Sequence, residues 1–168
     1  FYNHFDENVK KLIGINTESE ETKCKVSLLR LQLYTLYASD KEDDFIRSVK
    51  SETFPSLENE IETSLESLGQ THSEYNRLKA RYLYFKGISI LPAEKEALCQ
   101  SAFDIFRLID QSELTDQDKE MFGEISYILA DKHFKEGNWD EAINSLNLLS
   151  SKSEVLNKEY NLIGNLLN

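Results

Sequence analysis

Apolar residues along this chain recur three and four positions apart, the spacing that places side chains on one face of an α-helix. The clearest stripe, Leu57, Ile61, Leu65 and Leu68, ends at Gly69. No segment alternates apolar and polar residues as a half-buried strand does. The pattern predicts an all-α protein of about eight or nine helices, joined by links of roughly two to eight residues. The other stripes are Phe5, Val9, Leu12 and Ile13; Tyr75, Leu78, Tyr82 and Phe85; Leu98, Ala102, Ile105 and Ile109; Phe122, Ile125 and Leu129; and Leu156, Tyr160, Ile163 and Leu167.

The segment from Cys24 to Leu36 carries apolar residues on more than one face of its expected helix. A helix that is apolar around most of its circumference is covered on two sides in a folded protein. Thr17 and Glu20 precede it at the spacing of a capping box, in which side chains satisfy open backbone donors. We therefore expect the inner helix of a stack. Its apolar residues are Cys24, Val26, Leu28, Leu29, Leu31, Leu33 and Leu36.

Two further helix starts are marked by the same capping-box spacing. Thr71 is followed by Glu74, and Thr115 is followed by Asp118. Between these two starts, Ile88–Leu91 is a short apolar link. Because exposed loops are seldom apolar, we expect this link to be packed against the core.

A helix–turn–helix pattern near the C-terminal end points to a known family. Leu129-Ala130 is followed by Gly137-Asn138-Trp139-Asp140-Glu141-Ala142-Ile143, and Leu146 and Leu149 continue the second helix. This segment, at about 122–149, resembles a tetratricopeptide repeat, a unit of about 34 residues. The resemblance implies antiparallel helical hairpins stacked as an α-solenoid. On this basis we expect residues 1–168 to form a single helical-repeat domain.

The matching positions have physical roles in such a hairpin. Ala130 and Ala142 are small, so two helices can approach closely where they cross. Gly137 is expected to take the left-handed conformation that ends the first helix. The resemblance implies that Trp139 fills the wedge between the hairpin and its neighbour.

Other positions depart from the family pattern. His133 stands where the family often has an aromatic residue, and the proline near the end of the repeat is missing. Ala80 and Gly87 repeat the offset of Ala130 and Gly137, so Gly87 is expected to end a helix. The separation of Ala80 from Ala130 exceeds one repeat, which predicts irregular repeats. Because the chain opens without Met, we expect it to be a segment of a longer protein.

The charge balance restricts the partners. The chain has 30 acidic and 19 basic residues among 168, a net charge of −11. Direct binding to nucleic acid needs cations that neutralise phosphates, and anionic membranes attract cations likewise. We expect neither of these partners. An acidic surface favours a basic or amphipathic segment of another protein, for instance a subunit of a larger complex.

No recognisable catalytic, metal-binding or cofactor-binding motif occurs. His4, His72 and His133 are scattered, and no Zn²⁺-ligand spacing, phosphate loop or nucleophile motif is present. Cys24 and Cys99 lie in apolar helical contexts, which indicates free buried thiols rather than a disulfide. We expect a protein that is not an enzyme and has no cofactor and no metal. A reducing location, cytoplasmic or nuclear, follows from the cysteines and from the absence of a spanning apolar run.

The resemblance also suggests a partner-binding face. If the hairpin follows the family, Tyr127, Asp131, Phe134 and Lys135 line the concave side of its first helix. Family members that hold chaperone tails use Lys, Asn and Arg there to bind a C-terminal carboxylate. Asp131 stands at their asparagine position and would repel that carboxylate, so we expect no such clamp. The alternative is that Tyr127 and Phe134 pack on the preceding helix pair.

Two functions follow from these features. The first is a non-catalytic scaffold that binds a segment of a partner protein through helical-repeat surfaces. The alternative is a ligand- or peptide-responsive regulator, because bacterial helical-repeat peptide receptors resemble this architecture too. A closed groove with polar groups placed for a ligand would favour the regulator, and an exposed apolar patch would favour the scaffold.

Overall fold

The computed structural model describes residues 11, 18–38 and 49–150. These residues form six α-helices and no strand, which confirms the all-α prediction for the described part. The stripes at 5–13 and 156–167, and the capping residue Thr17, lie outside it. The helices are α2 (Glu20–Ala38), α4 (Phe54–Leu68), α5 (Tyr75–Phe85), α6 (Lys95–Leu108), α7 (Asp116–Lys135) and α8 (Trp139–Ser150). Short π-helical turns occur at Val49–Thr53 and Lys86–Ile90, and 3-10 turns at Pro92–Glu94 and Gln111–Glu113.

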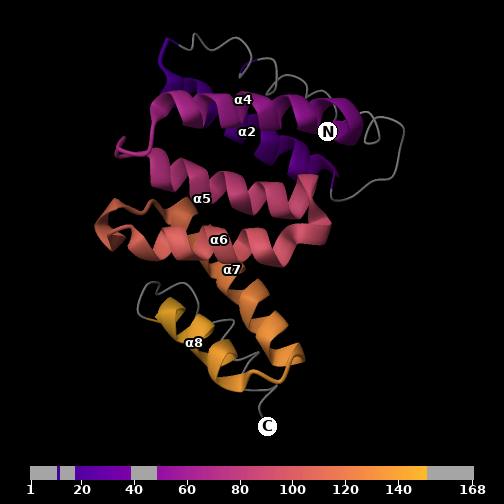
Figure 1. Ribbon diagram of the computed structural model, residues 1–168, viewed down its shortest axis with the longest axis vertical. Helices are drawn as coiled ribbons and strands as arrows, with labels where there is room; N and C mark the ends of the chain where they lie inside the picture. Colours follow the sequence, from indigo (N-terminus) through magenta and orange to yellow (C-terminus); the bar gives the residue numbers. More distant parts are fainter. Residues whose placement is uncertain (1–10, 12–17, 39–48, 151–168) are drawn as a thin grey trace.

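The helices pack mainly on their neighbours in the chain. α4 lies against α2, α5 contacts both of them and α6, and α7 contacts α5, α6 and α8. Figure 1 shows α2 and α4 at one end of the molecule, α5 and α6 in the middle, and the α7–α8 pair at the other end. No helix in the described part of the chain is long and apolar enough to cross a membrane.

The core lies between α2, α4, α5, α6 and the first half of α7. We call these helices together the body. Phe54 from α4, Phe106 from α6 and Phe122 from α7 are among its largest fully buried side chains. The rings of Phe103 and Phe122 stack with centroids 5.1 Å apart, and Phe106 meets Phe122 edge-on at 6.0 Å. These aromatic contacts join α6 to α7.

Several local predictions are confirmed. Leu57, Ile61 and Leu65 are buried on one face of α4. The helix ends at Gly69, which has a positive φ of 78°. Thr115 caps α7 in a capping box with Asp118, with both reciprocal hydrogen bonds present.

The predictions for the two ends of α5 were wrong. The helix begins at Tyr75, and Glu74 makes no side-chain capping bond. The Glu74 carboxylate pairs with Arg77 and Lys25 instead. Gly87 has no positive φ, and the chain continues through it as a π-helical turn. A Cβ at Gly87 would lie 3.3 Å from Lys95 Cα and Leu98 Cβ, so this glycine permits close packing on α6.

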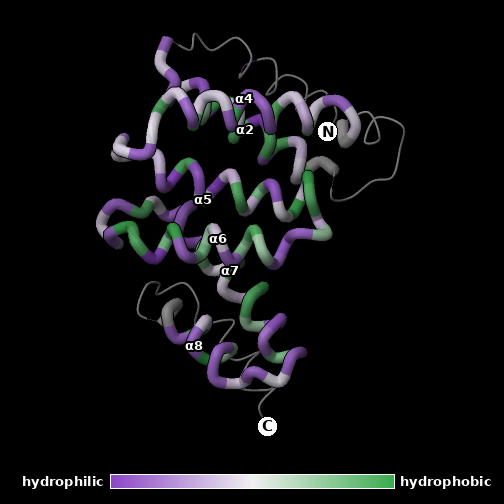
Figure 2. The backbone as a smooth tube through the Cα atoms, in the orientation of Figure 1, coloured by the Kyte–Doolittle hydropathy of each residue, from purple (hydrophilic) through white to green (hydrophobic). Residues whose placement is uncertain are grey.

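The apolar link after α5 is packed, as expected. Ile88 and Ile90 are partly buried against the core, and the hydroxyl groups of Ser89 and Thr35 lie 2.6 Å apart. In Figure 2 this connection between α5 and α6 forms a hydrophobic stretch of the tube. Within the turn, the Leu91 amide donates a hydrogen bond to the Lys86 carbonyl at 2.8 Å.

α2 is covered less completely than its pattern predicted. Cys24, Leu28 and Leu31 are buried against α4 and α5, but Leu29 and Leu36 are exposed among the described residues. α2 forms one edge of the body, and Leu29 and Leu36 stay exposed there.

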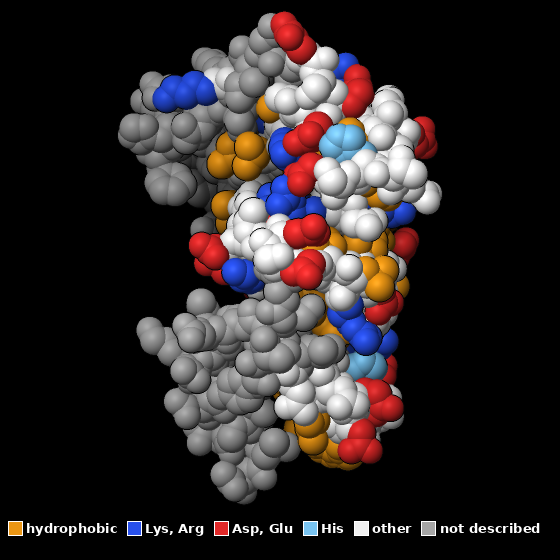
Figure 3. Space-filling view, turned by 90° about the vertical axis from the view of Figure 1, so that its left-hand side faces the viewer, with side chains coloured by type: hydrophobic (Ala, Val, Ile, Leu, Met, Phe, Trp, Pro, Cys, Tyr) orange, Lys and Arg blue, Asp and Glu red, His pale blue; other side chains and the backbone are white. Residues whose placement is uncertain are grey.

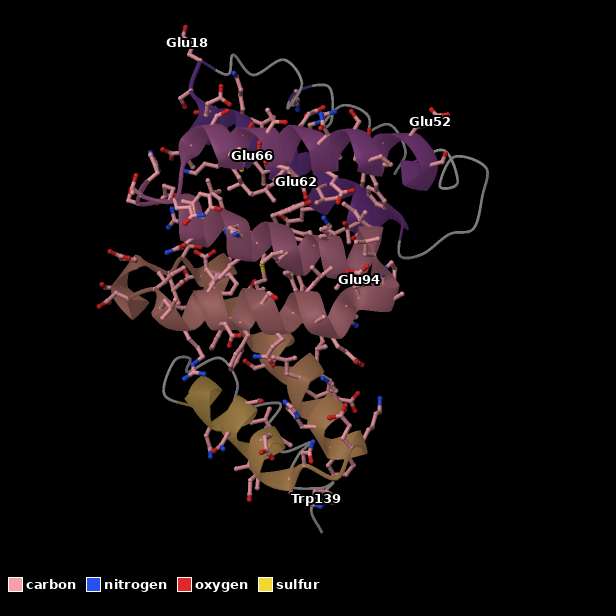
Figure 4. All side chains as sticks on the ribbon, in the orientation of Figure 1. Glu18, Glu52, Glu62, Glu66, Glu94 and Trp139 are labelled. Carbon is pink, nitrogen blue, oxygen red and sulfur yellow. The ribbon has the colours of Figure 1, made fainter. Side chains whose placement is uncertain are left out.

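α7 and α8 form a helical hairpin joined by a tight turn. Gly137 has a positive φ of 78°, and Ala130 and Ala142 are buried where the helices meet. Both features agree with the sequence predictions. Trp139 does not: it is 52% exposed and fills no wedge among the described residues. Figure 4 shows it at the tip of the hairpin.

Candidate interaction surface

The four residues predicted to bind a partner share one side of α7. Tyr127, Asp131 and Lys135 are spaced four apart, and Phe134 lies on the same side of the helix. Tyr127 is 41% exposed and Phe134 is 38% exposed. Both side chains therefore keep part of their surface in solvent, so packing on the preceding helix pair does not cover them completely.

The two charged members of this set pair with each other. Lys135 Nζ lies 2.6 Å from Asp131 Oδ2, an exposed contact one helical turn apart. The hydrogen bond and charge of Asp131 raise the pKa of Lys135. The pair neutralises itself, and exposed pairs of this kind contribute little to stability. Tyr127 and Phe134 are therefore the members of this set that present exposed apolar surface to a partner.

α8 extends this apolar surface with two residues that the sequence did not assign to it. Phe134 and Trp139 meet edge to face, with ring centroids 4.8 Å apart and an angle of 85° between the planes. Ile143, one turn after Trp139, is 44% exposed. We call Tyr127, Phe134, Trp139 and Ile143 the hairpin face. The family resemblance had directed Trp139 inward, and only the packing of α8 revealed its exposure.

Acidic side chains lie near the hairpin face. Glu136, Asp140 and Glu141 are all exposed at or just after the turn between α7 and α8. Figure 3 shows hydrophobic side chains gathered at the foot of the molecule, with acidic side chains next to them. An apolar surface beside carboxylates is electrostatically suited to a ligand that is apolar on one side and basic at its edge.

His133 lies within the hairpin rather than on its face. Its Nδ1 is buried without a hydrogen-bond partner, and the nearest carboxylate oxygen, Glu136 Oε2, is 3.9 Å away. Part of its side chain stays accessible. This placement favours a structural role in the hairpin over a partner contact.

A second feature is a hollow between α2, α5 and α7, on a different part of the molecule. Its volume is about 140 Å³. The walls combine apolar side chains with three cations and two amides. The lining residues are Lys25, Leu28, Leu29, Gln32, Arg77, Leu78, Arg81, Phe85 and Gln117.

The thiol groups show no sign of chemical activation. Burial raises the pKa of Cys24 to about 12 and that of Cys99 to about 11. Both are therefore protonated at neutral pH and are poor nucleophiles. Within the described ranges, no group of three or more His, Cys, Asp or Glu side chains could hold a metal ion.

Comparison with known proteins gives no relative for this chain: no protein-family profile, curated protein or solved structure matches it.

Proposed function

We propose that this protein is a non-catalytic interaction module that binds an amphipathic, basic segment of a partner protein on the hairpin face. The observation that carries the proposal is the exposed pair of Phe134 and Trp139, which meet edge to face, with the exposed Ile143 one helical turn after Trp139. Large aromatic side chains dominate the binding energy of protein interfaces. Exposed apolar groups gathered in one place mark interaction sites more often than scattered ones do.

The chemistry of the partner follows from the surroundings of the hairpin face. Its apolar residues would pack on Trp139, Phe134 and Ile143, and its basic residues would lie near Glu136 and Asp140. Charge complementarity of this kind accelerates association and selects among partners more than it adds affinity. A tetratricopeptide-like solenoid in the cytoplasm or nucleus, as one part of a larger complex, is the architecture we propose around it.

Trp139 provides a direct test because it is the single tryptophan of the chain. Two helical peptides with the same apolar stripe, one with Lys and one with Glu at the polar positions, are titrated while tryptophan emission is recorded. We expect the Lys peptide to shift Trp139 emission to shorter wavelength and to bind about tenfold more tightly than the Glu peptide at low salt. Ile143→Ala, which keeps the reporter, should weaken binding about tenfold.

A matched control is Leu108→Ala, which removes an exposed leucine from α6 instead. This variant should bind like the wild type. The natural partner is sought by purifying the full-length protein with its associated chains and identifying them by mass spectrometry, in parallel with the Ile143→Ala variant. If the two peptides bind alike, or if Ile143→Ala retains every partner, the hairpin face is not the binding site.

The alternative function, a ligand-responsive regulator, is favoured by one observation, the hollow between α2, α5 and α7. Its amides Gln32 and Gln117 meet at 3.0 Å beside apolar walls, which is a combination suited to a small ligand. Discriminating the two functions requires binding measurements at each site separately.

A further inference from the structure

The hollow between α2, α5 and α7 has an apolar floor. Leu28, Leu78 and Phe85 are buried residues of the core that line it, and Leu29 borders it from the exposed side of α2. A volume of about 140 Å³ is close to that of an engineered apolar cavity of about 150 Å³ that binds benzene. The space therefore fits one apolar group of the size of a leucine or phenylalanine side chain.

The charged residues that line the hollow are all cations, although the chain carries a net charge of −11. They are Lys25 on α2 and Arg77 and Arg81 on α5. Figure 3 shows Lys and Arg side chains gathered among acidic ones partway down this side of the molecule. Arg81 is bound to the start of α7: its Nε lies 2.5 Å from Asp118 Oδ1, and its Nη2 donates a hydrogen bond to Thr115 Oγ1 at 3.0 Å.

Lys25 and Arg77 share one carboxylate partner that does not line the hollow, and Lys25 also pairs with Glu21 on its own helix. Glu74 Oε2 accepts a hydrogen bond from Arg77 and lies 3.3 Å from Lys25 Nζ. Burial alone would raise the pKa of Glu74, but the hydrogen bonds and charges of Arg77 and Lys25 outweigh it and hold the pKa below its usual range. Glu74 thus demonstrates that a carboxylate fits between these two cations.

We propose that the hollow binds a small monocarboxylate with one apolar group. The apolar group occupies the space among Leu28, Leu78 and Phe85, and the carboxylate takes the place of Glu74 between Lys25 and Arg77. Free aromatic or aliphatic acids and the C-terminal residue of a peptide share this chemistry. The site is separate from the hairpin face, so the proposal stands or fails independently of the partner-binding function.

The test uses the chain as it is, with isotope-labelled methyl and amide groups followed by nuclear magnetic resonance. Phenylacetate is titrated beside two matched probes, the neutral phenylacetamide and acetate, which lacks the apolar group. We expect phenylacetate to bind with a dissociation constant of about 1–10 mM. Shifts should concentrate at Leu28, Leu78 and Phe85, and each matched probe should bind at least about fivefold more weakly.

Two variants identify the role of the cations. Lys25→Gln should weaken phenylacetate binding about fivefold to tenfold, since it removes one of the two charges that face the carboxylate. Lys23→Gln is the matched control, because Lys23 is an exposed lysine of the same helix that pairs with Glu20 and does not line the hollow. Glu74→Gln should strengthen binding by a similar factor, because the one carboxylate that Lys25 and Arg77 share loses its charge, while Glu21 still pairs with Lys25.

A comparison of two peptides shows whether the ligand is a free acid or the C-terminal residue of a peptide. A short acetylated peptide ending in Phe is compared with its C-terminal amide, and tighter binding of the free-acid peptide than of phenylacetate identifies a peptide end as the ligand. The proposal is overturned if phenylacetamide binds as well as phenylacetate, if Glu74→Gln weakens binding, or if shifts avoid the hollow. Unchanged Trp139 emission throughout would show that the hairpin face does not respond.

Discussion

The body and the α7–α8 hairpin place their aromatic side chains in opposite ways. In the body, Phe54, Phe106 and Phe122 are fully buried. In the hairpin, which we count from Ser126 onward, the described aromatic residues Tyr127, Phe134 and Trp139 are all exposed. A buried phenylalanine stabilises the fold, whereas an exposed aromatic group contributes most when another molecule covers it.

The same contrast appears in the polar contacts. Asp118 in the body is fully buried and bound by Arg81 and Thr115, whereas Asp131 in the hairpin pairs with Lys135 at the surface. This contrast indicates that buried contacts in the body provide most of the free energy of unfolding. The hairpin keeps exposed side chains that are available for binding. The hairpin should also open at lower free energy, because local unfolding follows the density of buried apolar contacts.

The largest expected effect is on the core of the body. Phe106→Ala should lower the free energy of unfolding by about 3–5 kcal/mol, because it leaves a cavity beside Phe122. Phe134→Ala makes the same chemical change in the hairpin and should cost about 1 kcal/mol, the value of one aromatic contact. Urea denaturation followed by circular dichroism measures both. Equal losses would contradict the comparison.

The next effect compares the two aspartates. Asp118→Asn should lower the free energy of unfolding by about 3 kcal/mol, because the variant leaves the Arg81 guanidinium without its buried counterion. Asp131→Asn breaks a pair at a similar distance, but in water, and should cost less than about 0.5 kcal/mol. The same denaturation measurement applies, and a large loss for Asp131→Asn would show that the hairpin pair is not solvated.

The Asp118 pair also predicts a pH dependence. Burial alone would raise the pKa of Asp118, but hydrogen bonds from Arg81 and Thr115 and the charge of Arg81 hold it below the usual range. A carboxyl whose pKa is lower in the folded state stabilises the fold above its unfolded pKa of about 3.9, and this contribution is lost as pH falls through the folded pKa. The stability difference between wild type and Asp118→Asn should therefore be constant near neutral pH and shrink below about pH 4.

The features that could be predicted from the sequence depend on neighbouring residues. The α4 stripe, the capping box of Thr115 and Asp118, and the left-handed Gly137 each involve residues within one or two turns of a helix. Local backbone geometry determines them, so the pattern of residues was sufficient. The residues proposed for the first helix of the hairpin were also found together on one exposed side, because helical spacing places them there.

The features that could not be predicted depend on residues far apart in the chain. Glu74 has the spacing of a capping residue but pairs with Lys25, which no local pattern indicates. Gly87 has the offset of a helix end, yet its role is to let α6 approach. The exposure of Trp139 depends on what covers the hairpin, and helical periodicity does not report that.

The two glycines give a smaller effect with different causes. Gly87→Ala should cost about 1–3 kcal/mol because the new Cβ would meet the backbone of Lys95 at 3.3 Å. Gly137→Ala meets nothing within 4 Å, but its positive φ is unfavourable for alanine by about 1–2 kcal/mol. Gly137→Asn should recover part of that loss, since asparagine tolerates this conformation. Thermal denaturation of the three variants separates them. If asparagine does not help at position 137, backbone strain is not the cause.

The smallest effect on stability is expected at the residue proposed to matter most for binding. Trp139→Ala removes a large side chain, yet half of its surface is already in water and its described ring contact is with another exposed residue. The free energy of unfolding should fall by about 1 kcal/mol or less. Exchange of the slowest amides in the body should accelerate by no more than about fivefold, the factor that this loss implies. A loss as large as that of Phe106→Ala would mean that the folded chain itself covers Trp139 in solution, and the hairpin face would then belong to the core rather than to a partner.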